Sequence, residues 1–268
     1  MTATLHPKST WTRALVTGAS SGIGLAMAQQ LAERSTHLVV VARDQERLDA
    51  LAVDVMTAHD VQVEVLVADL ADPADLDRVA ARVSAVERPI DLLVNNAGIG
   101  FDGPFADLDY AGEATVVAVN VVALHRLCHA AAQAMRDRGG GTVLNVSSVA
   151  AELVGPGSAT YNATKAFVNS FSQSLAVDLA DSGVVVSCLM PGMTRTEFQE
   201  RAGSDINDVP DWIWQTAEQV AEAGLVGAEA GKAIVVSGKR NRVLRSVNAS
   251  LPGPVRRAVT AAVSRARE

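Results

Sequence analysis

Short runs of apolar, largely β-branched residues alternate along this chain with longer amphipathic stretches, and this alternation constrains the fold most. The predicted strands are residues 13–17, 38–42, 62–67, 91–95, 141–147, 184–190 and 233–237. The predicted helices are residues 22–34, 45–58, 73–86, 108–138, 159–182 and 216–227. Short strands that are apolar throughout are typical of a parallel sheet buried on both faces. The pattern therefore predicts right-handed strand–helix–strand units in one doubly wound α/β sheet.

The length of the chain fits one such domain. It has 268 residues, of which 49% are hydrophobic, enough for a single large core. We expect a flexible N-terminus at 1–11, a seven-stranded Rossmann-type domain at 12–238 with a helical substrate lid at about 197–220, and a basic C-terminal extension at 239–268. The N-terminus lacks the apolar run of a signal peptide. The sequence contains no run of about 18 uninterrupted apolar residues, so we predict no membrane span.

Charge is distributed unevenly. Residues 239–268 carry Lys239 and seven arginines against one acid, Glu268, whereas the rest of the chain has 15 basic and 29 acidic side chains. The acidic body argues against nucleic acid as a partner. Apolar residues recur at helical spacing near the end of the extension, which predicts an amphipathic basic helix. That helix could dock on the acidic body or a partner subunit, which we favour, or make weak peripheral contact with an anionic membrane.

The two cysteines, Cys128 and Cys188, both lie in apolar stretches. Two cysteines cannot form a disulfide framework, so we expect buried thiols in a reducing, cytoplasmic environment. We predict no metal site, because the sequence has no His, Cys or carboxylate cluster with metal-ligand spacing.

A glycine-rich turn follows the first predicted strand, in LVTGASSGIG. Gly18, Gly22 and Gly24 allow a tight turn and a close approach of the backbone to a ligand. The helix that begins there presents free N–H groups and the positive end of its dipole, which suit a pyrophosphate. The alternative is a tight connection without a ligand. The position after the first strand favours a dinucleotide cofactor.

The end of the second strand bears on the choice of cofactor. An NAD-selective site usually has Asp or Glu there, on the ribose 2′-hydroxyl. Ala42 stands at that position, and Arg43 follows it. A guanidinium can bind the 2′-phosphate that a carboxylate would repel, so the sequence favours NADP(H) over NAD(H). The alternative is that Arg43 is a solvated residue at the start of a helix capped by Asp44.

Further motifs complete a pattern: TGASSGIG, ADL, NNAG, AVNVV, NVSSVA, YNATK and PGMTRT occur in this order over about 12–200. Together they resemble the short-chain dehydrogenase/reductase family. The resemblance implies an NAD(P)-linked oxidoreductase that interconverts the carbonyl and alcohol forms of a small molecule. It implies cofactor contacts from Gly18, Ser20, Ser21, Gly22, Ile23, Gly24, Arg43, Asp69, Leu70, Asn96, Ala97, Gly98, Tyr161, Lys165, Pro191, Gly192, Thr194 and Thr196. Either of the two threonines could bind the nicotinamide or instead cap the next helix.

The stretch SATYNATKAF places Tyr161 one helical turn before Lys165. A free phenol has a pKa of about 10, and a neighbouring ammonium lowers it, so Tyr161 is predicted as a general acid–base near neutral pH. The resemblance adds that Ser148, rather than its neighbour Ser147, holds the substrate oxygen beside Tyr161, and that Lys165 binds the nicotinamide ribose. It also implies that Asn120 distorts its helix and holds a water linked to Lys165. Alternatively, Asn120 is only a satisfied buried amide.

The substrate is less constrained than the reaction. Trp212 and Trp214 of the lid could line a pocket or only anchor the lid. The other expected walls, 100–105 and 151–157, are mostly apolar or small, and no basic residue is obviously aimed at a carboxylate. We therefore favour an apolar ketone, aldehyde or secondary alcohol. A 3-oxoacyl thioester reductase and a non-catalytic NADP-binding regulatory protein are the alternatives.

The resemblance also implies an assembly. In the family, the helices that correspond to 108–138 and 159–182 usually pair across a two-fold axis. Both stretches are apolar over much of their surface here, so we expect a homodimer or a homotetramer.

Overall fold

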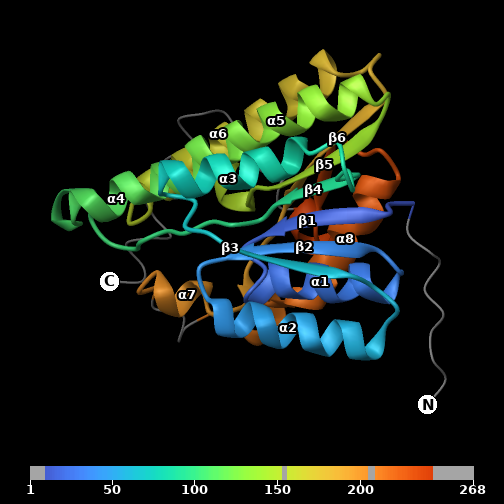
Figure 1. The fold of residues 1–268 in the computed structure, drawn as a ribbon. Coiled ribbons are helices and arrows are strands. Elements are labelled where there is room, and N and C mark those ends of the chain that lie inside the picture. The colour runs from blue at the N-terminus through green and yellow to red at the C-terminus, as the bar shows by residue number, and fades with distance from the viewer. Residues whose placement is uncertain (1–9, 153–155, 205–208, 244–268) are drawn as a thin grey trace.

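A computed structural model describes residues 10–152, 156–204 and 209–243 of the chain (Figure 1). Most of the predicted flexible N-terminus lies outside the described residues. So do positions 205–208 of the lid and the part of the basic extension that carries its expected amphipathic helix.

Seven parallel strands form one sheet in the order β3-β2-β1-β4-β5-β6-β9. The strands are β1 (Arg13–Thr17), β2 (His37–Ala42), β3 (Val63–Val67), β4 (Leu92–Asn95), β5 (Gly141–Val146), β6 (Val184–Met190) and β9 (Ile234–Val236). All seven predicted strands are confirmed, and no boundary moves by more than one residue. The strand order reverses between β1 and β4, and the crevice at the carboxyl ends of such strands is where ligands bind in sheets of this type.

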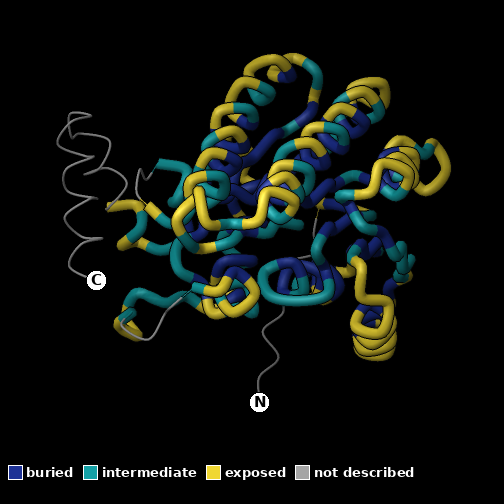
Figure 2. Tube along the Cα trace, turned by 90° about the vertical axis from the view of Figure 1, so that its left-hand side faces the viewer, coloured by how far each residue is buried: buried dark blue, intermediate teal, exposed yellow. Residues whose placement is uncertain are grey.

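Helices cover both faces of the sheet (Figure 1). One layer contains α1 (Gly22–Glu33), α2 (Gln45–Ala58) and α8 (Ala217–Glu229), and the other contains α3 (Pro73–Ser84), α4 (Tyr110–Val117), α5 (Leu124–Asp137) and α6 (Ala159–Asp178). Neighbouring residues of β1 alternate between the layers: Leu15 packs with α3 and α5, and Val16 with α1 and α8. The inner strands of the sheet are therefore buried on both sides, and Figure 2 shows buried residues towards the centre of the molecule and exposed ones mainly on its outside.

Local sequence explains where several helices begin. The side chains of Asp44, Asp72, Asp109 and Thr216 each accept a backbone hydrogen bond from the first turn of α2, α3, α4 and α8. Pro73 occupies the first helical position of α3. Two predicted starts are thereby corrected by one or two residues, since Asp109 and Thr216 are caps and the helices begin after them.

The predicted helix 108–138 contains a local distortion. A π-helical turn, η2 (Ala118–Ala123), separates α4 from α5, and Asn120 lies within it. The Asn120 side chain bonds to the backbone of Ile99 and to Thr164, so it is drawn towards the sheet. The expected distortion at this asparagine is thus present. The helix predicted at 159–182 corresponds to α6, which ends earlier than predicted, at Asp178.

The described part of the lid is only partly helical. It contains α7 (Phe198–Arg201), the 3₁₀ turn η4 (Asp211–Ile213) and β8 (Gln215–Thr216), and the strand β7 (Thr194–Arg195) lies just before it. β7 and β8 pair in parallel as a small second sheet, which the sequence did not predict because two-residue strands leave no periodic pattern. Two more 3₁₀ turns, η1 (Phe105–Asp107) and η3 (Val149–Glu152), lie in the loops after β4 and β5.

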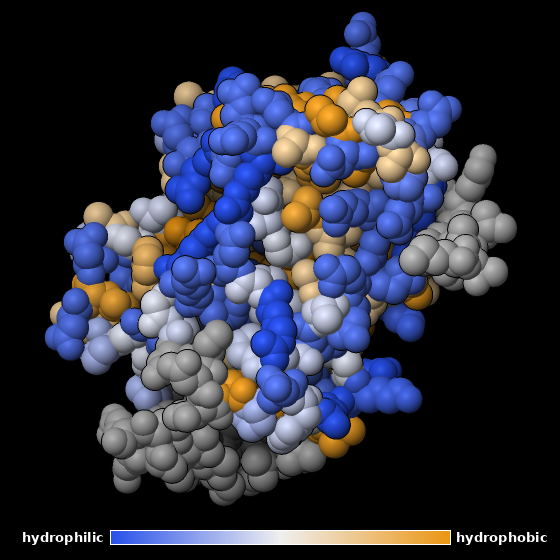
Figure 3. Space-filling view, turned by 90° about the horizontal axis from the view of Figure 1, so that it is seen from below, coloured by the Kyte–Doolittle hydropathy of each residue, from blue (hydrophilic) through white to orange (hydrophobic). Residues whose placement is uncertain are grey.

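The surface is mainly polar on the side of α1, α2 and α8, with scattered apolar residues (Figure 3). On the other side, the continuous helix Tyr110–Asp137 is the one candidate membrane span within the described residues, by length and apolar composition. Half of its most apolar window is buried inside the protein. That burial is what the core helix of a two-layer α/β domain requires, so it is weak evidence for a span.

Candidate active site

The glycine-rich turn lies between β1 and α1 and is built tightly. Gly18 and Gly22 have positive φ angles of 66° and 57°, which other residues rarely adopt. A Cβ atom on Gly24 would lie 2.2 Å from the carbonyl oxygen of Gly18, so only glycine fits there. Ser21 is the N-cap of α1 but makes no capping hydrogen bond, and the first turn has no acid. The Ser21 side chain therefore leaves the first N–H groups of α1 uncapped, which is a feature that an anion site needs.

Thr17, which we did not single out from the sequence, ties this turn to the loop after β4. Its Oγ1 accepts hydrogen bonds from the backbone N–H groups of Asn96 and Ala97, both 3.0 Å long. The Asn96 amide donates in return to the carbonyl oxygens of Thr17, at 2.9 Å, and Gly18, at 3.3 Å. The predicted cofactor residues of NNAG thus fix the shape of the glycine turn. The position of Thr17, at the end of an apolar strand and directly before the glycine-rich turn, was the sequence signal that could have identified it.

Arg43 lies at the carboxyl end of β2, next to Asp69 at the end of β3. The Arg43 side chain is 69% exposed, and its Nη1 is 3.9 Å from Asp69 Oδ2. Asp44 also caps α2, as the alternative interpretation of this segment required. The two interpretations are compatible, because a guanidinium that is mostly exposed can turn towards other partners while Asp44 caps the helix. Leu70, the other residue predicted beside the adenine, is buried.

Tyr161, Ser148 and Lys165 come together at the carboxyl end of β5. Ser148 follows that strand and shares a hydrogen bond with the half-buried Tyr161 side chain. The Lys165 Nζ atom lies 5.7 Å from the centroid of the Tyr161 ring and donates to the carbonyl oxygen of Val146 at 3.0 Å. Ser147 is used differently, because its hydroxyl donates to the backbone oxygen of Lys165 at 2.9 Å. Of the two serines, Ser148 therefore faces Tyr161.

Burial shifts both titratable groups towards their neutral forms. It raises the pKa of Tyr161 to about 12, an effect that the hydrogen bond with Ser148 partly offsets. It lowers the pKa of Lys165 to about 8, an effect that Cys188 partly offsets. The expectation that Lys165 lowers the pKa of Tyr161 is thus wrong for the chain by itself. Loss of hydration is the largest cause of the Tyr161 shift, and only the Ser148 hydrogen bond opposes it.

Asn120 is bound on both sides of its amide. Its Oδ1 accepts from Ile99 N at 3.0 Å, and its Nδ2 donates to Ile99 O at 2.8 Å and to Thr164 Oγ1 at 3.0 Å. A Cβ atom on Gly98 would lie 3.2 Å from Lys165 Nζ and 3.4 Å from Asn120 Oδ1. Glycine at 98 thus lets both polar groups approach the end of β4. Protein groups therefore satisfy the hydrogen bonds of this amide, as the alternative interpretation of Asn120 as a buried structural amide requires.

The two candidate threonines both lie in the segment after β6, but in different surroundings. Thr194 is buried, and its hydroxyl donates to the carbonyl oxygen of Gly192 at 2.9 Å. Thr196 lies next to the glycine-rich turn, where a Cβ atom on Gly22 would be 3.0 Å from Thr196 Cγ2. Its Oγ1 also accepts from the N–H of Phe198 at the start of α7. Of the two side chains, Thr196 is the one beside the glycine turn. The carbonyl of Pro191 accepts from Val149 N, linking this segment to the Ser148 loop.

Phe198 of α7 covers one side of the Tyr161 ring, a contact that the sequence did not reveal. The two ring centroids are 5.3 Å apart and the rings are tilted by 48°. A Cβ atom on Gly100 would lie 2.8 Å from Tyr161 Cδ2 and 3.4 Å from Phe198 Cζ, so glycine is needed where this backbone passes both rings. The backbone N–H of Asp102 donates to the carbonyl oxygen of Ala202 at 2.9 Å, which fixes the loop after β4 to the end of α7.

The two lid tryptophans contact arginines rather than Tyr161. The guanidinium of Arg240 lies 5.0 Å from the centre of the Trp212 ring, and that of Arg195 lies 5.3 Å from the centre of the Trp214 ring. The Trp214 indole also donates to the carbonyl oxygen of Val209. These contacts favour anchoring of the lid over lining of a pocket.

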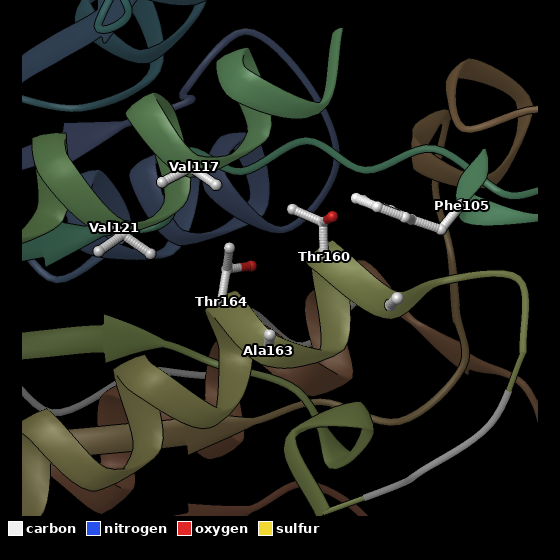
Figure 4. Close-up of a pocket in the computed structure, with 7 residues that line it drawn as sticks. Phe105, Val117, Val121, Thr160, Ala163 and Thr164 are labelled. Carbon is white, nitrogen blue, oxygen red and sulfur yellow. The ribbon is translucent and has the colours of Figure 1, made fainter. Parts of the chain in front are cut away.

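An apolar groove lies apart from these groups, between α6 and the segment formed by α4 and η2 (Figure 4). It is lined by Phe105, Val117, Val121, Ala159, Thr160, Ala163 and Thr164. None of the predicted catalytic residues lines it. The groove is therefore a separate surface feature on the outer side of the helices.

Comparisons with known proteins show the family to which the chain belongs. A family model described as short chain dehydrogenase matches residues 12–207. The gluconate 5-dehydrogenase of Gluconobacter oxydans is 37% identical over 204 residues, which cover 75% of this chain and 78% of that protein.

Solved structures agree as well. A short-chain dehydrogenase from Sphingobium yanoikuyae in complex with NADPH is 36% identical, with a TM-score of 0.81 over 90% of this chain and 96% of that one. The bulky-bulky ketone specific alcohol dehydrogenase from Comamonas testosteroni is 30% identical, with a TM-score of 0.76 over 93% of this chain and 96% of that one. The chain therefore belongs to the short-chain dehydrogenase/reductase family.

Proposed function

We propose that this chain is an NADP(H)-dependent oxidoreductase that interconverts a carbonyl and an alcohol, with Tyr161 as the general acid–base. The observation that carries the proposal is the meeting of Tyr161, Ser148 and Lys165 at the carboxyl end of the sheet. The tight glycine turn, Asn96 and Thr196 lie at the same edge. A proton donor beside a dinucleotide site is what carbonyl reduction requires.

The residues present fit a dinucleotide. Gly18, Gly22 and Gly24 fold the backbone into a tight turn, and α1 begins there without a side-chain cap, so a pyrophosphate would lie at its N-terminus. Arg43 at the end of β2 would bind a 2′-phosphate. It would then give up its long ion pair with Asp69 in favour of the phosphate. When bound, the nicotinamide supplies the hydride donor or acceptor of the reaction.

The chain's own side chains can supply the proton that carbonyl reduction needs. Burial raises the pKa of Tyr161 to about 12, so the phenol is protonated near neutral pH and can donate. In the direction of reduction, the carbonyl carbon gains a hydride and the carbonyl oxygen gains the Tyr161 proton, which yields the alcohol. Ser148, whose hydroxyl is already paired with Tyr161, holds that oxygen in place. In the direction of oxidation, the same phenol must first lose its proton.

Lys165 and Asn120 support the role of Tyr161 in two different ways. Lys165 has a pKa of about 8, so its ammonium is present near neutral pH and would stabilise the phenolate as it forms. The Asn120 side chain fixes the backbone of Ile99 and the hydroxyl of Thr164, which in turn donates to the Tyr161 carbonyl oxygen at 2.7 Å. Asn120 thereby positions the first turns of α6.

We infer an apolar carbonyl compound as substrate. Phe198 and Gly100 form an uncharged surface against Tyr161, and a substituent of the carbonyl carbon would lie there. Gluconate and bulky ketones are the substrates in the names of two relatives, so the family comparison spans polar and apolar molecules. The uncharged surface that Phe198 and Gly100 form favours the apolar class.

The test is a screen of purified protein against a carbonyl panel, following the loss of reduced cofactor. The panel contains alkyl and aryl ketones, aldehydes, 5-ketogluconate and a 3-oxoacyl thioester, each with NADPH and with NADH. The proposal predicts turnover of apolar ketones or aldehydes and faster reaction with NADPH. Tight NADPH binding without turnover of any carbonyl, or of any alcohol with NADP⁺, would favour the non-catalytic regulatory alternative. Turnover only of the thioester would favour the 3-oxoacyl reductase.

We also infer a homo-oligomer that covers the groove of Figure 4. Val117, Val122 and Phe167 on the same helices are exposed by 41%, 52% and 36% of their surface. Apolar side chains gathered on one face are typical of an interface. Light scattering should give a mass of at least two chains, and Phe167→Glu should lower it. A monomeric wild-type protein would contradict the inference.

A further inference from the structure

The start of the C-terminal extension packs against the segment that follows β6. Asn241 lies so close to Gly192 that a Cβ atom there would be 2.2 Å from Asn241 Nδ2 and 2.8 Å from its Oδ1. The three atoms nearest to that Cβ position all belong to the Asn241 amide, and Gly192 does not have a positive φ angle. The Asn241 amide is therefore the first obstacle that a side chain at position 192 would meet.

Hydrogen bonds fix the Asn241 amide in this place. Its Nδ2 donates to the carbonyl oxygen of Ser237 at 2.8 Å and to Gln215 Oε1 at 3.1 Å. Ser237 is fully buried and donates through its hydroxyl to the same Gln215 oxygen at 2.8 Å. The lid thus meets two neighbouring segments, the end of β9 and the start of the C-terminal extension, in one polar cluster.

The cluster also holds the backbone beyond Gly192. The N–H of Gln215 donates to the carbonyl oxygen of Met193 at 2.9 Å, and Gln215 pairs with Thr194 across β7 and β8. Thr194 donates to the carbonyl oxygen of Gly192. The backbone of residues 192–194 is therefore fixed on one side by Gln215 and packed on another by Asn241.

A second contact ties the extension to the lid. The Arg240 guanidinium lies over the Trp212 ring, 5.0 Å from its centre, and donates a hydrogen bond to the carbonyl oxygen of Trp212. Arg240 and Asn241 are adjacent, so one short stretch contacts both the lid and Gly192.

We propose that Asn241, acting with Gln215, is a positioning residue for the nicotinamide half of the cofactor. It sets the backbone of residues 192–194, which lies at the carboxyl end of the sheet beside the Ser148 loop. The inference rests on the proposed function, because it assumes that this backbone binds the nicotinamide end. The first residues of the basic extension then form part of the cofactor site.

Two ligands separate this role from a general structural one. NADP⁺ contains the nicotinamide, whereas adenosine 2′,5′-bisphosphate contains only the other half of the cofactor. Calorimetric titration of the full chain gives the Kd of each. Asn241→Ala should weaken NADP⁺ binding about tenfold and change bisphosphate binding by less than about twofold. Lys239→Ala, two residues away and exposed, is the matched control and should bind both ligands as the wild type does.

A double-mutant cycle tests the contact itself. Gly192→Ala should weaken NADP⁺ binding more than Asn241→Ala does, because the new methyl group meets the Asn241 amide. Adding Asn241→Ala to Gly192→Ala should restore binding to the level of Asn241→Ala alone, so the two changes are not additive.

Three results would overturn the inference: wild-type NADP⁺ affinity in Asn241→Ala, equal loss of both ligands in that variant, or additive effects in the cycle. If the wild-type chain binds neither ligand, the proposed function fails and the inference fails with it. Binding of both ligands by the wild type leaves the proposed function standing whatever the variants do.

Discussion

The ammonium nitrogen of Lys165 lies 5.7 Å from the centre of the Tyr161 ring, and the Lys165 residue is only 4% exposed. The nitrogen bonds to the carbonyl oxygen of Val146, and this hydrogen bond holds the ammonium over the ring. Burial consequently governs both groups, lowering the pKa of Lys165 and raising that of Tyr161. This relationship makes the site sensitive to pH in a predictable direction.

The first prediction concerns stability. The pKa of Lys165 falls from 10.5 to about 8 on folding, so between these pH values the unfolded chain binds a proton that the folded chain does not. The free energy of unfolding therefore gains a contribution that rises with pH across this window. Chemical denaturation from pH 7 to 10.5 should show this rise in the wild type and not in Lys165→Met. Lys239→Met, at an exposed position, should follow the wild type. Parallel curves for wild type and Lys165→Met would contradict the burial of the charge.

The second prediction concerns substrate size. Phe198→Ala removes the ring that covers one side of Tyr161, so the variant should accept larger substituents. The ratio of kcat/KM for a bulky aryl ketone to that for a small alkyl ketone should rise about tenfold, with little change in NADPH affinity. Phe105→Ala is the matched control, because Phe105 lines the separate groove of Figure 4. An unchanged ratio in Phe198→Ala, or an equal change in Phe105→Ala, would remove Phe198 from the pocket.

The third prediction concerns the choice of cofactor. Loss of a charge-assisted contact to the 2′-phosphate in Arg43→Ala should raise the Kd of NADPH by about ten- to a hundredfold. The Kd of NADH should change by less than about twofold, since NADH has no phosphate at that position. Arg136→Ala provides the control, because it removes an exposed arginine near the end of α5. Equal effects on the two cofactors would show that Arg43 is only a solvated residue.

Much of the fold could be predicted because its strands are apolar throughout. All seven strands of the sheet have this pattern, and the distortion at Asn120 followed from the family resemblance. The pair β7 and β8 could not be predicted, since each strand has two residues and is defined only by its partner.

The predicted catalytic residues do come together, but two properties of the site depend on contacts between distant segments. Phe198 meets Tyr161, and Asn241 meets Gly192, through loops whose paths no local pattern encodes. The direction of the Tyr161 pKa shift was wrong for a related reason. Helical spacing gives the distance to Lys165 but not the burial that outweighs it.

The central claim is that Tyr161 exchanges the proton, and the most direct measurement compares Tyr161→Phe with the wild type on the carbonyl that the panel identifies. The chain has only 2 tyrosines, so Tyr110→Phe, at a position 82% exposed, is the matched control. We predict that Tyr161→Phe lowers kcat by about a thousandfold or more while the Kd of NADPH stays within about twofold of the wild type. Tyr110→Phe should retain full turnover. Turnover near the wild-type rate in Tyr161→Phe would contradict the claim.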